Sequence, residues 1–499
     1  MAEGENRANP IERNTMTQLA FESATNLVQK IKSGELTSVG LLEHYLARVD
    51  SHNSELNAVI VQIRERAMAR AKEADAALAR GEDWGPLHGL PMTVKESYNL
   101  AGTPTTWGEP NWRDNIPTED ALAVQRLEGA GAVVFGKTNV PLMLSDFQSY
   151  NAVYGTTNNP WDLGTTPGGS SGGSAAALAA GLTGLEIGSD IGGSIRNPAH
   201  FCGVFGHKPT WQLLPMRGHA GPGILTPSDI SVIGPLARSA YDLQTAVEVM
   251  AGPDEIPSRG YALDLKTPEQ KQLKDFRVAV WKDDPIAPVD REVIGRVEKV
   301  AEIFAKAGAT VDETARPEFT AEHVMNTYQN LLWANMASRQ SDEAYEGMQQ
   351  VVAELPDNDD GPGATMLRAQ VATFRDFSRH NEARTHIRWG YHRFFQQWDV
   401  LLTPMTATAA FPHDQTDMGG RRITVNNEPQ PYFMQLFWAG FSGVSYLPST
   451  VVPTGPNSRG LPIGVQIVGP EYGDLTTLKA AQLLEDQGMV FQPAPNFVD

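Results

Sequence analysis

Apolar residues recur at three- and four-residue intervals through the N-terminal part of the chain. This spacing places them on one face of an α-helix, as is typical of helices that pack against a core. The hydroxyl residues Thr37 and Ser38 provide an N-cap for the second of these patterns. The helices predicted in this part of the chain span 17–31, 38–49 and 64–79.

The pattern changes at residue 86, where short apolar runs begin to alternate with glycine-rich turns and compact helical segments. Alternating strands and helices are typical of layered α/β proteins. The predicted strands here span 91–95, 132–136 and 184–188, and the predicted helices span 119–129 and 173–180.

The same alternation returns in the C-terminal half, around a mainly helical region at 317–398 that a loop at 356–363 interrupts. No internal repeat or low-complexity linker divides the chain. We therefore expect an α/β fold with a central mixed twisted sheet surrounded by helices, in a single large domain over 16–499 after a disordered tail at 1–15. The further predicted strands span 277–281, 400–402, 450–452 and 463–468, and the further helices span 291–307 and 474–486.

The chain of 499 residues has a formal net charge of −19. Acidic proteins are poorly suited to broad contact with nucleic acid or anionic membranes. The average charge also disfavours strongly anionic substrates, unless a local basic pocket overrides it. No apolar run reaches the length of about 18 residues that spans a bilayer, the N-terminal segment lacks a signal-peptide core, and Cys202 has no second cysteine to pair with. These features predict a cytoplasmic protein.

A match to the phosphate-loop pattern falls on residues 131–138, GAVVFGKT. A phosphate loop needs a preceding strand and a flexible turn between its glycines. Here the residues between the glycines form an apolar strand of their own, and a helix precedes them. The sequence favours a structural strand and leaves a nucleotide-dependent enzyme as a minor alternative. No group of histidines or cysteines has metal-ligand spacing, so neither a metal nor a cofactor is expected.

The strongest chemical signal is the stretch from Pro167 to Pro198, which holds two glycine-flanked serine clusters, GGSSGGS and GSDIGGS. Serine supplies a nucleophile, and successive backbone N–H groups bind an oxyanion. Ser171 matches a nucleophile elbow, but that motif needs a buried strand before it, and polar residues precede Ser171. A neutral lysine is an alternative base for a serine. Lys95 ends an apolar strand, where it would be partly desolvated.

Three segments together resemble the amidase signature family: GLPMTVKES at 89–97, PGGSSGGSAAALAAG at 167–181 and GSDIGGSIRNPAHFCGVFGHKPT at 188–210. This family includes bacterial amidases, aryl acylamidases, fatty acid amide hydrolases and amidotransferase A subunits. The resemblance extends from about residue 17 to residue 486. It implies the amidase signature fold, with a signature core at about 86–215, and a serine-dependent amide hydrolase.

The resemblance also implies a Ser-Ser-Lys triad, in which Ser194 is the nucleophile, Ser170 relays protons and Lys95 is the base. Because Lys95 must start neutral, we expect activity to fall as the pH drops below its lowered pKa. Ser171 becomes a supporting hydrogen-bonding residue. A cis peptide bond is expected between Gly169 and Ser170, as in relatives.

An oxyanion hole formed by consecutive backbone N–H groups is implied by the same resemblance. Its expected members are Ile191, Gly192, Gly193 and Ser194. Asp190 and Arg196 flank this loop and resemble the family's supporting pair, a role that is compatible with a structural salt bridge.

Relatives build part of the substrate wall from the segment that follows GKTNVP. The corresponding residues here are Met143, Leu144, Phe147 and Gln148. Trp107 and the pair Phe437–Trp438 are further candidates for closing over an acyl or aryl group, with core packing as the open alternative.

The sequence thus predicts a hydrolase that cleaves the C–N bond of small neutral amides, either anilides or aliphatic amides, with esters and carbamates (urethanes) compatible with the same chemistry. A tRNA-dependent amidotransferase of the A type is the alternative, although SDFQSYNAVY at 145–154 differs from the Ser-Ser-Thr-Glu-type sequence of those proteins. The expected partner is a small-molecule substrate, without nucleic acid or membrane. Monomer and homodimer both remain open.

Overall fold

The computed structural model describes residues 18–359 and 361–498, so the tail predicted at 1–15 lies outside the described residues. An eight-stranded mixed sheet forms the centre of the molecule, in the order β10-β9-β11-β15-β14-β7-β8-β6. Its strands are β6 (Glu186–Asp190), β7 (Phe205–Lys208), β8 (Val232–Ala237), β9 (Arg277–Val280), β10 (Thr310–Asp312), β11 (Val400–Pro404), β14 (Ser449–Pro456) and β15 (Pro462–Val468).

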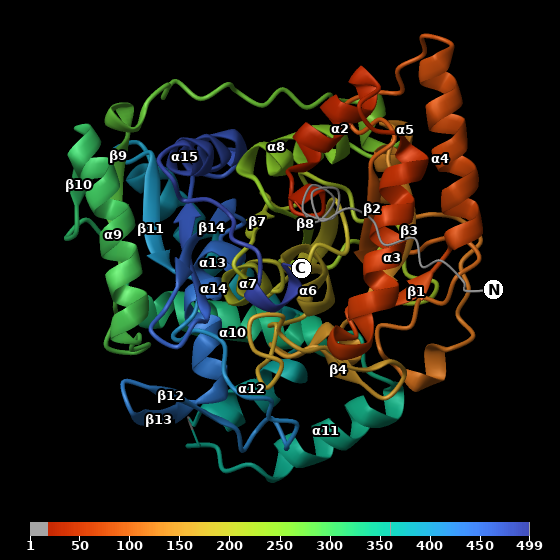
Figure 1. Cartoon of the computed structure of the whole chain (residues 1–499). Coiled ribbons are helices and arrows are strands. Elements are labelled where there is room, and N and C mark those ends of the chain that lie inside the picture. The colour runs from red at the N-terminus through yellow and green to blue at the C-terminus, as the bar shows by residue number, and fades with distance from the viewer. Residues whose placement is uncertain (1–17, 360, 499) are drawn as a thin grey trace.

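Helices surround this sheet (Figure 1). Both faces of its central strands are covered, because Val452 of β14 packs into one apolar cluster and its neighbour Val451 packs into another. The helices are α2 (Ala24–Ser33), α3 (Ser38–Leu56), α4 (Arg64–Ala79), α5 (Leu122–Gly129), α6 (Gly172–Ala179), α7 (Arg196–Cys202), α8 (Ala240–Met250), α9 (Arg291–Ala307), α10 (Ala321–Ala337), α11 (Asp342–Glu354), α12 (Pro362–Gln370), α13 (Phe374–Phe394), α14 (Leu436–Val444) and α15 (Asp474–Asp486).

A second, three-stranded sheet lies beside β6, at the edge of the first sheet. It has the order β1-β3-β2, with β1 at Val59–Gln62, β3 at Val133–Thr138 and β2 at Pro91–Lys95. The Gly184 N–H donates to the Pro91 carbonyl at 3.2 Å, and the Tyr98 hydroxyl donates to the Gly188 carbonyl at 2.6 Å. These bonds bring the end of β2 next to the end of β6. Two short hairpins complete the strands: β4 (Tyr150–Asn151) with β5 (Gly155–Thr156), and β12 (Arg422–Val425) with β13 (Glu428–Pro431).

The predicted α/β class with a central mixed sheet in a single domain is confirmed. The observed bounds of β2, α4, α9 and α15 equal the predicted ones. Strand β8 was absent from the prediction because Gly234 and Pro235 interrupt its apolar run, although both are buried between two partner strands.

The phosphate-loop match has no structural basis, because Gly136, Lys137 and Thr138 form part of the buried strand β3. A Cβ atom at Gly136 would lie 2.4 Å from the Val61 carbonyl oxygen. The Lys137 Nζ atom donates to the Pro104 carbonyl at 2.6 Å, away from any loop between the glycines. The nucleotide-dependent alternative therefore loses the motif on which it rested.

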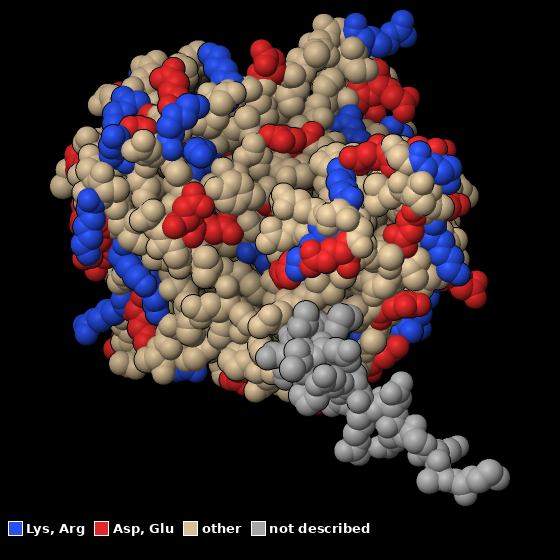
Figure 2. Space-filling view, turned by 45° about the horizontal axis from the view of Figure 1, so that its top comes forward, with Lys and Arg blue, Asp and Glu red and all other residues tan. Residues whose placement is uncertain are grey.

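The surface carries both signs of charge. On the face shown in Figure 2, basic and acidic side chains are interspersed. Among the described residues, no helix is long and apolar enough to cross a lipid bilayer.

Candidate active site

Lys95 lies at the end of β2 and is fully buried. Its Nζ atom donates to Ser170 Oγ at 2.6 Å and to Ser189 Oγ at 2.9 Å. Burial lowers the pKa of Lys95 well below its ordinary value; the carboxylate of Asp190 opposes this shift, and the charge of Arg339 adds to it. A lowered pKa enriches the neutral amine, which is the form that accepts a proton.

Ser170 reaches this lysine from a tightly packed glycine-rich loop before α6. The Gly169–Ser170 peptide bond is cis, as expected. A Cβ atom at position 169 would lie 2.2 Å from the Asp146 carbonyl oxygen. The Gly169 N–H donates to Asn197 Oδ1 at 3.2 Å, which ties this loop to α7. Only glycine fits at position 169 without displacing the loop that presents Ser170.

The loop that carries Ser194 is held by a buried ion pair. The Asp190 carboxylate accepts the backbone N–H groups of Gly193 at 2.8 Å and Ile195 at 3.1 Å. Arg196 donates to the same carboxylate at 2.8 and 2.9 Å. Burial by itself raises the pKa of Asp190, but the charge and hydrogen bonds of Arg196 outweigh it and bring the pKa to about 2. The pair is therefore ionised and fixes the turn between β6 and α7.

The structure corrects one member of the expected oxyanion hole. The Gly193 N–H already donates to Asp190, so it is not available to a reacting carbonyl oxygen. Gly193 instead supplies the turn itself, with a φ of 108°. Of the four expected donors, the N–H groups of Ile191, Gly192 and Ser194 have no acceptor within residues 18–359 and 361–498.

Tyr328 of α10 orients this part of the loop. Its hydroxyl donates to the Ile191 carbonyl at 3.0 Å. Because a trans peptide is planar, the N–H of Gly192 points away from Tyr328. The hydrogen bond thus fixes the direction of an expected oxyanion donor.

Ser171 joins the two serine loops to β6. Its backbone N–H donates to the Ser194 carbonyl at 3.0 Å. Its hydroxyl donates to the Ser189 carbonyl at 3.4 Å and accepts the Ser189 N–H at 3.3 Å. These contacts suit a supporting residue, because the hydroxyl faces backbone groups.

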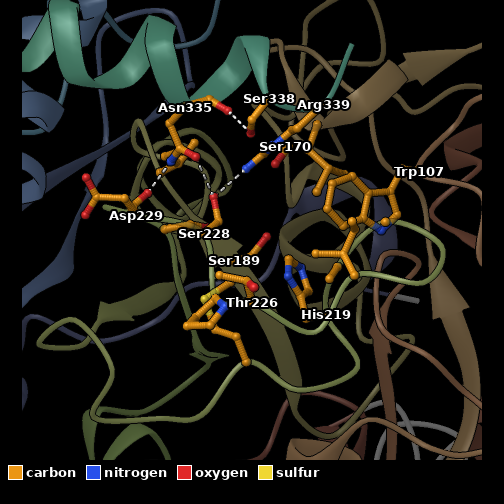
Figure 3. A pocket seen from close by; sticks show the side chains of 18 of the residues that line it. Trp107, Ser170, Ser189, His219, Thr226, Ser228, Asp229, Asn335, Ser338 and Arg339 are labelled. Atoms are coloured by element: carbon orange, nitrogen blue, oxygen red, sulfur yellow. Dashed lines mark hydrogen bonds between the residues drawn. The ribbon is translucent and has the colours of Figure 1, made fainter. Parts of the chain in front are cut away.

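Ser194 lies between two cavities. The larger has a volume of about 490 Å³, and Ser194 lines it together with Ser170. Figure 3 shows Ser170 on the wall of this cavity. The smaller has a volume of about 50 Å³ and a mainly apolar wall. Ile191, Leu144 and Ser194 line both. A bound amide therefore has space on two sides of the serine.

Two of the four residues expected to line the substrate site do so. Leu144 lines both cavities, and Phe147 lines the smaller one. The prediction was wrong for Met143, which packs against Trp107. It was also wrong for Gln148, whose amide is engaged with the backbone of Asp414 at 2.6 and 2.9 Å. Met143 lies in the 3₁₀ turn at Leu142–Leu144, where its φ is 51°, whereas Gln148 lies beyond this turn.

Of the three aromatic residues considered for the substrate site, one lines a cavity and two lie in the core. Trp107 lines the larger cavity. Phe437 and Trp438 are buried in the apolar core around Trp281, so the core alternative holds for them.

Several cavity residues were not anticipated from the sequence. Ser189 lies in the motif GSDIGGS, and its place in that motif was the detectable signal for its bond to Lys95. His219 and Arg339 lie outside every recognised motif, and tertiary folding alone brings them to the wall. The His219 Nε2 atom contacts Ser97 Oγ at 2.9 Å, whereas the buried Nδ1 atom has no partner among the described residues.

Comparison with known proteins agrees with this geometry. The sequence model of the family described as Amidase matches residues 40–478. The A subunit of the glutamyl-tRNA(Gln) amidotransferase of Carboxydothermus hydrogenoformans is 30% identical over 492 residues, which cover 94% of this chain and 97% of that protein.

Solved structures show the same fold over nearly the whole chain. A protein from a vestigial complex that reveals the evolutionary origins of an s-triazine catabolic enzyme has a TM-score of 0.80 and 28% identity, covering 95% of this chain and 100% of the other. The structure of 6-aminohexanoate cyclic dimer hydrolase complexed with substrate has a TM-score of 0.76 and 28% identity, covering 96% and 100%.

Proposed function

Because this chain belongs to the amidase signature family and is an amide hydrolase, we propose that it cleaves small amides through an acyl-enzyme on Ser194. Anilides and aliphatic amides are the proposed substrates, and esters and carbamates can follow the same carbonyl chemistry. The proposed partner is a small-molecule substrate, without nucleic acid or membrane, and the chain acts as a monomer or a homodimer.

The observation that carries this proposal is the hydrogen bond of 2.6 Å between Lys95 and Ser170, on the wall of the cavity that Ser194 also lines. A base, a relay hydroxyl and a second hydroxyl thus converge on one space. Desolvation of Lys95 favours the neutral amine that such a relay requires.

The reaction follows from these positions. Ser194 Oγ attacks the amide carbonyl carbon, and its proton passes through Ser170 Oγ to Lys95 Nζ. The C–N bond then breaks, and Ser170 delivers a proton to the departing nitrogen while Lys95 returns to neutral. Water attacks the acyl-enzyme by the same proton path and releases the carboxylic acid.

The negative charge of the tetrahedral intermediate needs donors that are already in place. The N–H groups of Ile191, Gly192 and Ser194 fill this role in the proposal, since each is free of protein acceptors in the described structure. Loss of one such donor typically costs about 3 kcal/mol of transition-state stabilisation.

A hydrolysis panel tests the proposed substrate class. The purified chain is offered acetanilide, butyramide, phenyl acetate and an N-phenyl carbamate, and each product is quantified by chromatography. We expect turnover of at least one amide, and its loss in a Ser194→Ala variant. No amide turnover across the panel, or equal turnover in the variant, contradicts the proposal.

The amidotransferase alternative is supported by one observation, the 30% identity to the A-type amidotransferase protein over nearly its full length. That protein is named for the transfer of an amide group to glutamyl-tRNA(Gln), and glutamine is a small primary amide that could donate one. Release of ammonia from free glutamine by the purified chain, faster than acetanilide hydrolysis, would favour this alternative over the proposed one.

A further inference from the structure

Arg339 places a positive charge in the cavity next to the proposed catalytic serines. It follows the end of α10, and its side chain lines the larger cavity together with Ser170 and Ser194. In Figure 3 it extends toward Ser228, and its Nη2 atom donates to Ser228 Oγ at 3.2 Å. Its guanidinium carbon lies 5.5 Å from the centre of the Trp107 ring.

This charge lacks a counterion within the described part of the chain, where no carboxylate lies within 4.0 Å of its guanidinium. Burial lowers the pKa of Arg339 to about 10, so it is still cationic at neutral pH. Its charge lowers the pKa values of Lys95 and His219. Arg339 is only partly buried, and a partly desolvated cation is stabilised by an anion or by several acceptors that pair with it.

A neighbouring arginine shows the contrast. Arg384 of α13 donates to both carboxylate oxygens of Asp229 at 2.7 and 2.9 Å. Asp229 also accepts the Tyr446 hydroxyl at 2.6 Å. The carboxylate that lines this cavity is therefore committed to other partners, and it leaves Arg339 uncompensated.

The hydroxyl of Ser228 is also held by two hydrogen bonds. It donates to Asn335 Oδ1 at 3.1 Å and accepts from Arg339. The remaining N–H groups of the planar guanidinium are the donors that bind a carboxylate with two parallel hydrogen bonds. Trp107, Trp112 and Met216 are among the apolar residues that line the same cavity.

We propose that the substrate carries a carboxylate, which Arg339 binds in the larger cavity while the scissile amide lies at Ser194. The uncharged side of the amide then occupies the small apolar cavity. The inference rests on the proposed amidase function and narrows its substrate class to amides with an anionic group on one side. The overall acidity of the chain disfavours anions, but this local charge overrides the average.

Matched ligand pairs test the inference without turnover. Succinanilate and butyranilide differ by a carboxylate for a methyl on the acyl side, and 4-acetamidobenzoate and 4-methylacetanilide differ in the same way on the amine side. Affinities are measured by calorimetry with the full-length Ser194→Ala variant. We expect at least one carboxylate to bind about tenfold more tightly than its methyl partner, as a charge-assisted pair implies.

The role of Arg339 is isolated in the same background. Arg339→Gln should reduce that preference to about one, and Arg339→Lys should retain part of it because the charge remains. Arg459→Gln, at an exposed arginine of the β14–β15 turn, is the matched control and should keep the preference.

A preference that survives in Arg339→Gln overturns the inference, and so does the absence of any carboxylate preference, including no binding of either pair. The proposed function is judged separately, by whether the wild-type chain hydrolyses any amide, charged or uncharged.

Discussion

Lys95 is a buried amine that contacts two other parts of the chain, the loop of Ser170 and the strand of Ser189. Ser170 and Ser189 accept its hydrogen bonds, and burial lowers its pKa. The same burial would be unfavourable for a permanently charged lysine, so the geometry is best explained by a group that exchanges a proton.

Replacement of the base gives the first residue-level prediction. Lys95→Ala should lower kcat by about 10²- to 10⁴-fold, because the relay loses its proton acceptor. The acid-side fall in kcat/KM, which reflects protonation of Lys95, should also flatten. A pH–rate profile across the neutral range, from mildly acidic to alkaline buffers, measures both effects. An unchanged acid limb would show that another group titrates.

A second residue-level prediction concerns the charge near that base. Arg339 lowers the pKa of Lys95, so Arg339→Gln should raise it. Since activity requires the neutral amine, the acid limb for an uncharged anilide should move to higher pH. The pH profile of kcat/KM checks the direction. A shift toward lower pH would contradict the electrostatic account.

At the scale of elements, β6 and α7 form a unit around the Asp190–Arg196 pair. The carboxylate holds the turn between them, and Arg196 extends from the start of α7 to Ser442 Oγ of α14 at 2.7 Å and Gln466 Oε1 of β15 at 2.6 Å. The position of Ser194 thus depends on contacts with distant segments of the sequence.

Removal of this pair's cation should destabilise the chain strongly. Arg196→Met leaves Asp190 charged and buried, and we expect a loss of about 3–5 kcal/mol in unfolding free energy. Urea denaturation followed by circular dichroism measures it. Arg80→Met, at the exposed Arg80–Glu82 pair, is the control and should leave the unfolding free energy nearly unchanged, because solvent screens this pair. Equal losses of unfolding free energy in both variants would contradict a stabilising role of the Asp190–Arg196 pair.

The elements also show what the sequence can predict. The strand ending at Lys95 and the loops of Ser170 and Ser194 could be located, because local apolar patterns and recognisable motifs define them. The Gly193 N–H was wrongly assigned to the oxyanion hole. The sequence does not reveal that the Asp190 side chain accepts this N–H from within the same turn. Arg339 was missed because only tertiary packing brings the end of α10 to this cavity.

At the scale of the whole molecule, two sheets meet where the proposed chemistry takes place. β2 contributes Lys95 from the small sheet, and β6 leads to Ser194 from the large one. Neither sheet builds the site alone, which agrees with a single domain. Basic and acidic side chains are interspersed on the face that Figure 2 shows, although the chain as a whole has a net charge of −19.

That charge balance leads to a whole-molecule prediction about partners. Fluorescence anisotropy with labelled tRNA should show no saturable binding by the isolated chain at low salt, because a net negative protein gains little from counterion release. Binding that saturates in the micromolar range and weakens with salt would instead favour the amidotransferase alternative.

Active-site labelling tests the central claim most directly. The chain is treated with a serine-directed fluorophosphonate, and the modified residue is located by peptide mass spectrometry in the wild type and in Ser194→Ala. We expect one label, on Ser194, which the variant loses while its circular dichroism is unchanged. Labelling at Ser171, or labelling that persists in the variant, would contradict it.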